Sequence, residues 1–107
     1  MAMYKVEILA PAGNWAMLRA AVDAGADSVY FGVQGFNMRA TAKNFKSSEL
    51  GRIVEFCHKN KVKAYLTVNT IVYEDEVDKV KKLLKKAKDA KVDAVICWDF
   101  AVIKEVK

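Results

Sequence analysis

The most constraining feature of this 107-residue chain is a fourfold alternation of apolar, strand-like segments with helix-like segments. The expected strands lie at 6–10, 28–33, 62–69 and 93–98, and each is short and rich in β-branched or aromatic residues. The stretches between them carry apolar residues at 3.6-residue spacing, which is typical of amphipathic helices. This order predicts an α/β fold built of parallel (β/α) units, a class that places its chemistry at the carboxyl ends of the strands.

The length limits this architecture to a partial domain. A closed (β/α)₈ barrel needs about 250 residues, whereas this chain offers four strands, three complete helices and the start of a fourth. We therefore expect residues 1–107 to form a single domain, the N-terminal half of a TIM-type barrel, truncated before the second half. Segments 23–30 and 89–96 resemble each other at an offset of 66 residues, or two strand–helix units, which favours a barrel over an open sheet.

A dinucleotide-binding sheet is the alternative fold, and the sequence lacks the motif that this fold requires. That fold needs Gly-x-Gly-x-x-Gly after the first strand and an acidic residue at the end of the second. Here the first turn reads Pro11-Ala12-Gly13-Asn14, with one glycine, and the second strand ends at Gln34.

Start and stop signals place three helices. Asn14 is expected to cap the first helix, which ends at Gly25, and Ser47 or Ser48 is expected to cap the second. The third opens with acids at 74–76 and closes with lysines, the charge order that a helix dipole favours. Its expected inner stripe consists of Val77, Val80, Leu83, Leu84 and Ala87.

Composition narrows the class of protein further. The net charge of +5 comes mostly from lysines of the third helix, which is consistent with an RNA or phosphate partner or, more simply, with a solvated surface. Cys57 and Cys97 lie on different elements without a Cys-x-x-Cys spacing, so neither a disulfide nor a self-contained metal site is expected. No apolar run reaches the roughly 18 residues of a membrane span, and the chain leads straight into its first strand. We therefore expect a cytoplasmic protein without a membrane partner.

Polar residues near the expected strand ends form a candidate active site. Alternation along the third strand turns Thr67 and Asn69 away from the helices and into the barrel interior. The alternative is that Glu7 and Asn69 only satisfy each other and backbone groups inside a packed barrel. The expected cluster at one mouth consists of Glu7, Gln34, Thr67, Asn69 and Asp99.

The segment 35–46 is a second candidate, because it exceeds the usual 2–6 residues of such connections and long loops on this face tend to be functional. Arg39 and Lys43 offer cationic groups to a carboxylate or phosphate. Phe36 and Phe45 either stack on a substrate ring or pin the segment to the barrel.

The sequence offers few side chains for nucleophilic catalysis. Cys57 lies on the core stripe of the second helix, and His58 is expected to be a solvated helix residue rather than a base. Cys97, near the end of the fourth strand, is the only plausible nucleophile, and the single histidine is not placed to activate it.

Four stretches of the chain carry a family resemblance. They are 7–14 (EILAPAGN), 25–32 (GADSVYFG), 36–40 (FNMRA) with 43–45 (KNF), and 65–69 (YLTVN), and they follow one another in this order between residues 7 and 69. Together they closely resemble the start of the collagenase-like peptidase family, whose catalytic type is unassigned. The resemblance implies the N-terminal half of a barrel-type catalytic domain.

The family offers two activities. Peptide-bond hydrolysis is the first, and oxygen-independent hydroxylation of RNA or of a quinone precursor is the alternative, with prephenate as the oxygen donor in the RNA-modifying branches. Hydroxylation depends on an iron–sulfur cluster that cysteines in a later part of the protein would bind, so no cofactor is expected within this chain. Hydroxylation suits the residues better, because they include no evident hydrolytic apparatus.

The full-length parent is therefore expected to be an enzyme that acts on a peptide or an RNA. A third interpretation is an inert fragment that self-associates through open sheet edges.

The motif match carries over Glu7, Asn14, Arg39, Asn44 and Asn69. Asp99 stands where relatives often have Asp-Pro-Gly, but Phe100 and Ala101 replace the turn residues. The expected catalytic residues are Glu7, Asn69 and Asp99. The expected substrate-binding residues are Asn14, Gln34, Arg39, Lys43, Asn44 and Thr67.

Overall fold

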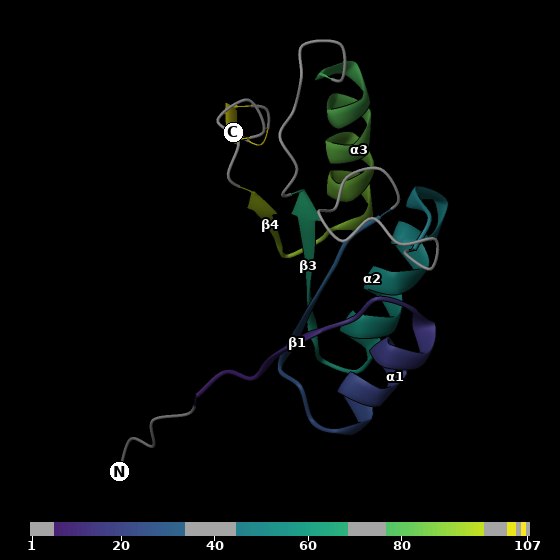
Figure 1. Cartoon of the computed structure of the whole chain (residues 1–107), viewed down its shortest axis with the longest axis vertical. Coiled ribbons are helices and arrows are strands. Elements are labelled where there is room, and N and C mark those ends of the chain that lie inside the picture. The colour runs from purple at the N-terminus through teal and green to yellow at the C-terminus, as the bar shows by residue number, and fades with distance from the viewer. Residues whose placement is uncertain (1–5, 34–44, 69–76, 98–102, 105, 107) are drawn as a thin grey trace.

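Four parallel strands form one sheet in the order β1-β2-β3-β4, which is also their order along the chain (Figure 1). The computed structural model describes residues 6–33, 45–68, 77–97, 103–104 and 106. The strands are β1 (Leu9–Pro11), β2 (Ser28–Phe31), β3 (Lys63–Val68) and β4 (Ala94–Cys97). A doubly wound sheet reverses its strand order, so this sequential order is the one that a barrel requires.

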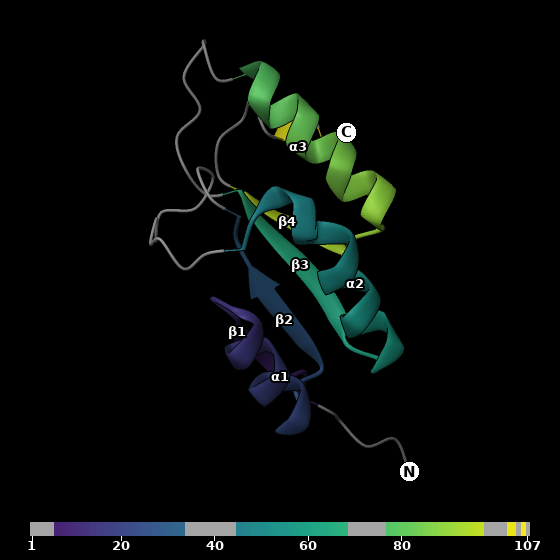
Figure 2. The same ribbon diagram turned by 90° about the vertical axis from the view of Figure 1, so that its right-hand side faces the viewer.

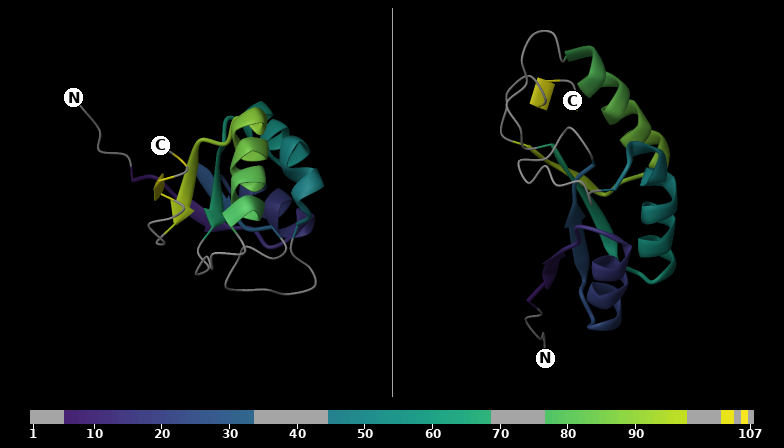
Figure 3. Two further views of the ribbon diagram at one scale, coloured as in Figure 1. Left: turned by 90° about the horizontal axis from the view of Figure 1, so that it is seen from above. Right: turned by 45° about the vertical axis from the view of Figure 1, so that its right-hand side comes forward.

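The helices cover a single face of the sheet (Figures 2 and 3). They are α1 (Trp15–Asp23), α2 (Leu50–Lys59), which follows a 3₁₀ turn at Ser47–Glu49, and α3 (Val77–Ala90). Alternate strand residues turn towards this layer and are buried, and the expected inner stripe of α3 is confirmed at Val80, Leu83 and Ala87. The core of this layer includes Leu18, Val29, Phe31, Ile53, Val54, Ala64, Leu66 and Val68.

The expected cap is confirmed for α1 but not for α2. The Asn14 side chain accepts a hydrogen bond from the Met17 N–H at 2.9 Å, so the expected cap of α1 is confirmed. The expected serine cap of the second helix is wrong, because Ser47 and Ser48 lie within the 3₁₀ turn and neither is the capping residue. Instead Glu49 Oε1 accepts from the N–H of Lys46 at 2.9 Å, because its longer side chain reaches back to the residue that precedes the turn.

The same turn follows each of the three helices. In each, a residue with positive φ reverses the chain: Gly25 (φ 95°) after α1, Lys61 (φ 60°) after α2 and Lys91 (φ 65°) after α3. The next N–H then bonds five residues back, as in a Schellman motif. These bonds are Ala26 N to Ala21 O (3.1 Å), Val62 N to Cys57 O (2.8 Å) and Val92 N to Ala87 O (3.2 Å).

Two aspartates repeat one another's role beside these turns. Asp27 Oδ2 accepts from the N–H of Ile8, and Asp93 Oδ2 accepts from the N–H of Ala64, both at 2.8 Å. Each carboxylate therefore ties the start of its strand to the strand before it. The sequence similarity between segments 23–30 and 89–96 thus corresponds to a structural repeat of two (β/α) units.

Candidate functional site

The face of the sheet opposite the helices carries the candidate site. On this face Tyr65 Oη donates to Glu7 Oε1 over 3.1 Å. Because β2 lies between β1 and β3, the Tyr65 side chain must cross β2 to reach Glu7. The bond therefore joins β3 to the segment that leads into β1, on the uncovered side of the sheet.

Glu7 does not join the expected cluster at the mouth. It precedes Leu9, which pairs with Ser28 at the start of β2, whereas Thr67 follows Leu66, which pairs with Phe31 at the end of β2. Glu7 thus lies towards the amino ends of the strands and Thr67 at their carboxyl ends. The expectation that they share one rim is corrected, because alternation gives the face of a residue but not its height along the sheet.

Thr67 is held at the carboxyl end by a local bond. Its Oγ1 donates to the carbonyl of Phe31 at 3.0 Å, and the residue is 4% exposed. Alternation places it on the same face as Tyr65, and its partner in register on β4 is Ile96. Thr67 therefore fixes the joint between β2 and β3 at the carboxyl ends of these strands.

Of the other expected site residues, one caps a helix and six are not among the described residues. Asn14 uses its side chain as the cap of α1. Six candidates lie outside the described residues: Gln34, Arg39, Lys43, Asn44, Asn69 and Asp99.

An aromatic cluster anchors the end of the segment that precedes α2. Phe45 pairs with Val33 in an isolated parallel bridge and is 2% exposed. Its ring meets those of Trp15 (5.7 Å between centroids) and Phe31 (5.8 Å) edge to face. Of the two roles considered for Phe45, the structure supports pinning the chain to the sheet, because the ring is buried against its own protein. Phe36 lies outside the described residues.

Glu49 completes this anchor, and the sequence analysis missed it. Its Oε2 accepts from Trp15 Nε1 at 2.7 Å, while its Oε1 accepts from the N–H of Lys46. The bond from Lys46 and then the bond from Trp15 lower the pKa of the Glu49 carboxyl. The pattern of an acid three residues after the start of a turn was the available signal.

A second missed contact lies at the amino ends of the strands. His58 Nε2 is 2.8 Å from Asp93 Oδ2, so His58 has a partner and is not simply solvated. Partial burial alone would raise the pKa of Asp93, but the bonds from the Ala64 N–H and His58 lower it. The pair joins α2 to the start of β4, at the end of the sheet opposite the candidate site.

The two cysteines have structural positions. Cys57 is fully buried, as expected, and burial together with the nearby Asp93 charge raises the pKa of its thiol to about 11. Cys97 pairs with Val68 in register and packs towards the helix layer, the face opposite Thr67. No disulfide joins them.

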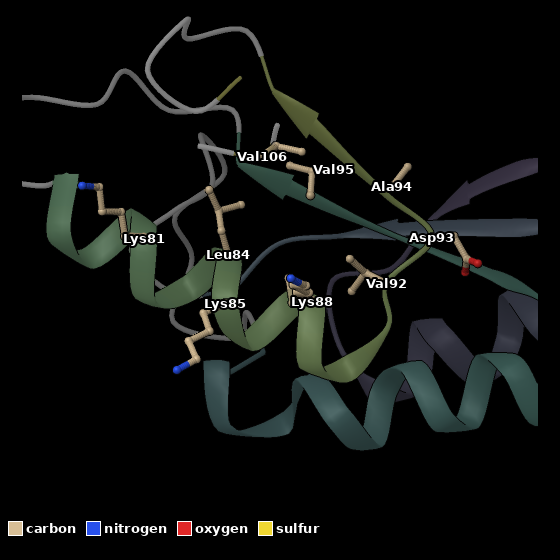
Figure 4. Close-up of a pocket in the computed structure, with 10 residues that line it drawn as sticks. Lys81, Leu84, Lys85, Lys88, Val92, Asp93, Ala94, Val95 and Val106 are labelled. Atoms are coloured by element: carbon tan, nitrogen blue, oxygen red, sulfur yellow. The ribbon is translucent and has the colours of Figure 1, made fainter. Parts of the chain in front are cut away.

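A groove of about 610 Å³ runs between α3, β4 and Val106 (Figure 4). Lys81, Lys85 and Lys88 contribute to its lining, together with apolar residues such as Val95. It lies on the helix side of the sheet, so it is separate from the face that carries Thr67.

The described residues do not fit an iron–sulfur site. Among them no group of three or more histidine, cysteine or acidic side chains is arranged to hold a metal. The cluster that the resemblance implies would have to take its ligands from elsewhere. None of the helices within the described ranges is long and apolar enough to cross a membrane.

Comparison with known proteins bears out the resemblance. The sequence model of peptidase family U32 matches residues 13–107. The chain is 45% identical over 98 residues to a collagenase of Porphyromonas gingivalis, covering 91% of this chain and 24% of that protein. It is 39% identical over 99 residues to tRNA hydroxylation protein P1 of Bacillus subtilis, covering 92% and 24%. The chain thus spans about a quarter of the length of these relatives.

A solved structure confirms the expected fold class. The U32 peptidase Mk0906 superposes with a TM-score of 0.71 and 13% identity over 97% of this chain and 45% of that chain. At this identity the likeness concerns the fold alone. It supports an α/β fold that is part of a barrel.

Proposed function

This chain belongs to peptidase family U32, and from that membership we propose that it takes part in the hydroxylation of RNA. In this reaction a C–H bond of a base becomes C–OH. The oxygen donor that the resemblance implies, prephenate, would give up a hydroxyl oxygen to the base carbon and take the two electrons and the displaced hydrogen in exchange. The similarity to tRNA hydroxylation protein P1, which covers 92% of the chain, supports this substrate class.

We favour hydroxylation over hydrolysis because of where the cysteine and histidine side chains lie. A hydrolase of the cysteine type needs a thiolate beside a base. The Cys57 thiol is buried with a raised pKa, Cys97 packs towards the helices, and His58 is bonded to Asp93 at the far end of the sheet. All three side chains therefore serve the scaffold of the described part of the chain.

We assign the reacting base to the carboxyl ends of β2, β3 and β4. In this assignment Asn69 and Asp99 act at the reacting atoms. The residues assigned to substrate binding are Asn14, Gln34, Arg39, Lys43, Asn44 and Thr67. Glu7 is left out of the reacting group, because its bond to Tyr65 lies towards the amino ends.

Deleting the gene tests the proposal. Total tRNA and rRNA from the deletion strain would be digested to nucleosides and compared with the parent by mass spectrometry. We expect one hydroxylated nucleoside to disappear and to return with the wild-type gene. An unchanged set of hydroxylated nucleosides would overturn the proposal.

Complementation with variants locates the substrate site. Arg39→Ala is expected to leave the modification at a small fraction of its normal level, because a guanidinium binds phosphate through paired hydrogen bonds. Lys59→Ala removes the same charge near the amino ends and is the matched control, with full restoration expected. Full restoration by both variants would reject the role of Arg39.

Peptide hydrolysis is the second candidate, favoured by the 45% identity to a collagenase. The purified protein would be incubated with gelatin and the products analysed for new termini. New peptide ends that appear in proportion to enzyme concentration would support hydrolysis. Their absence, together with a lost nucleoside in the deletion strain, would leave hydroxylation.

We also propose that the uncovered face of the sheet pairs with a second copy of the chain. Within the described residues β1 and β4 each pair on one side, and Leu9 (46% exposed) and Ile96 (37%), which alternation places on this face, present apolar surface. Open edges and exposed apolar patches favour association. Sedimentation at micromolar concentration tests this, and a monomer throughout the range would reject it.

A further inference from the structure

The outer surface of α3 consists of lysine alone over three turns. Between residues 79 and 88 every exposed position is a lysine, and the remaining positions are buried or half-buried. The acids of the helix, Asp78 and Asp89, flank this stretch. The lysine face, as we call it, consists of Lys79, Lys81, Lys82, Lys85, Lys86 and Lys88.

This arrangement works against the helix itself. Lysines three or four residues apart are neighbours on a helix surface, and like charges at this spacing repel. Lys82 has such neighbours at Lys79, Lys85 and Lys86. A helix selected for stability alone would alternate these lysines with glutamates. The uniform charge therefore points to an anionic partner that binds along the helix.

The groove beside α3 extends the positive surface. Lys81, Lys85 and Lys88 line it, and among the described lining residues the acidic one is Asp93 (Figure 4). Asp93 is already bonded to His58 and to the Ala64 N–H. The field over this side of α3 is therefore dominated by the lysines.

The direction of α3 connects the lysine face with the candidate site. The helix runs antiparallel to β3 (Figure 1). Its first turns, which carry Lys79, Lys81 and Lys82, therefore lie at the end of the sheet where the strands finish. The rest of the lysine face leads away from that end. With 14 residues, α3 extends for about 21 Å, long enough to follow several nucleotides.

We propose that the lysine face of α3 is a docking surface for the phosphate backbone of RNA. This inference rests on the proposed function, because it takes RNA as the substrate class. The surface would hold RNA by charge, without reading sequence, while the carboxyl ends of the strands receive the reacting base. Counterion release makes such binding strongly dependent on salt.

Two variants with the same change in charge test the proposal. K81Q/K82Q/K85Q/K86Q neutralises the lysine face, and glutamine keeps a helix propensity close to that of lysine. K59Q/K61Q/K63Q/K91Q removes four lysines near the amino ends and is the matched control. Binding of a fluorescently labelled, unmodified tRNA transcript to the 107-residue chain would be measured between about 50 and 200 mM salt.

We expect the α3 variant to bind the transcript at least tenfold more weakly and with a shallower salt dependence, and the control to change less than threefold. An equal loss in both variants would overturn the proposal, as would unchanged binding by the α3 variant or no binding by the wild type. Binding to phosphatidylserine vesicles instead of the transcript, lost in the α3 variant, would reassign the surface to membranes and also overturn it.

Two further measurements separate the causes of failure. Circular dichroism verifies that each variant is folded; if the fourfold variant unfolds, K85Q/K86Q replaces it, with a smaller loss of affinity expected in the same direction. The nucleoside analysis of the deletion strain reports on hydroxylation without any binding assay. A missing nucleoside with no binding to α3 would therefore reject the docking surface and leave the proposed function standing.

Discussion

Helices α2 and α3 bury similar inner faces but present different outer ones. Ile53 of α2 is 0% exposed and Leu83 of α3 is 3% exposed, and both belong to the same core. The outer face of α2 mixes charges such as Arg52 and Glu55, whereas that of α3 is lysine for three turns. The inner faces are fixed by packing in this shared core, whereas packing does not constrain the exposed outer faces. The difference therefore separates the requirements of folding from those of binding.

The largest expected effect tests whether the inner faces are equivalent. Ile53→Ala and Leu83→Ala should each lower the free energy of unfolding by about 2–5 kcal/mol, because each leaves a cavity in the core. Urea denaturation at neutral pH measures both. A loss below about 1 kcal/mol for Leu83→Ala alone would show that α3 packs more loosely than α2 and would break the comparison.

The next effect concerns the start of α2. Glu49→Ala removes the acceptor for Trp15 Nε1 and the Lys46 N–H, and should cost about 1–3 kcal/mol. Glu55→Ala, on the exposed face of α2, is the matched control and should stay within about 0.5 kcal/mol.

The Glu49 contribution should also depend on pH. Its pKa is lowered from 4.5 in the folded state, so the stabilisation is present above that value and is lost as the pH falls through the folded pKa. Urea titrations at neutral and acidic pH check this. A gap between wild type and Glu49→Ala that widens as the pH falls would contradict the assignment.

The ends of the two helices should respond alike. Lys61→Gly and Lys91→Gly each place glycine at a positive φ and should stabilise the protein by up to about 1 kcal/mol, because other residues are strained there. Gly25→Ala, at φ 95°, should destabilise by a similar amount. Thermal melting compares the three, and a loss of stability in both lysine variants would mean that these lysines make stabilising contacts.

The smallest expected effect comes from charge substitutions on the outer faces of α2 and α3. Lys82→Glu relieves repulsion in α3 and should raise stability by about 0.5 kcal/mol, while Arg52→Glu removes the exposed pair with Glu49 (3.7 Å) and should lower it by about as much. Both changes should shrink in about 1 M salt. Equal signs for the two substitutions at low salt would contradict the contrast.

Local patterns were enough to predict the elements and the core. The spacing of Val80, Leu83 and Ala87 identified the buried stripe of α3, and Asn14 identified the start of α1. The similarity of segments 23–30 and 89–96 predicted a repeat, which the structure shows in the equivalent bonds of Asp27 and Asp93. The stripe and the cap depend on residues within a few positions of one another, and the repeat was visible as similarity between two short segments.

Contacts between distant residues could not be predicted in this way. His58 and Asp93 are separated by 35 positions, and Tyr65 and Glu7 by 58. Such pairs depend on how the strands are offset, and alternation does not give that offset. The height of Glu7 along the sheet was misjudged for this reason, while Asn69 and Asp99 lie outside the described residues and stay predictions.

The sequential strand order has a consequence for how the molecule opens. Within the part of the chain that the structure describes, each strand pairs with its neighbours in the sequence, so β2 and β3 are hydrogen-bonded on both sides and β1 and β4 on one. Amide protons of Val29 and Leu66 should therefore exchange with solvent far more slowly than those of Ala10 and Ile96. We expect local unfolding to begin at the two outer strands and to reach the Thr67–Phe31 hydrogen bond last.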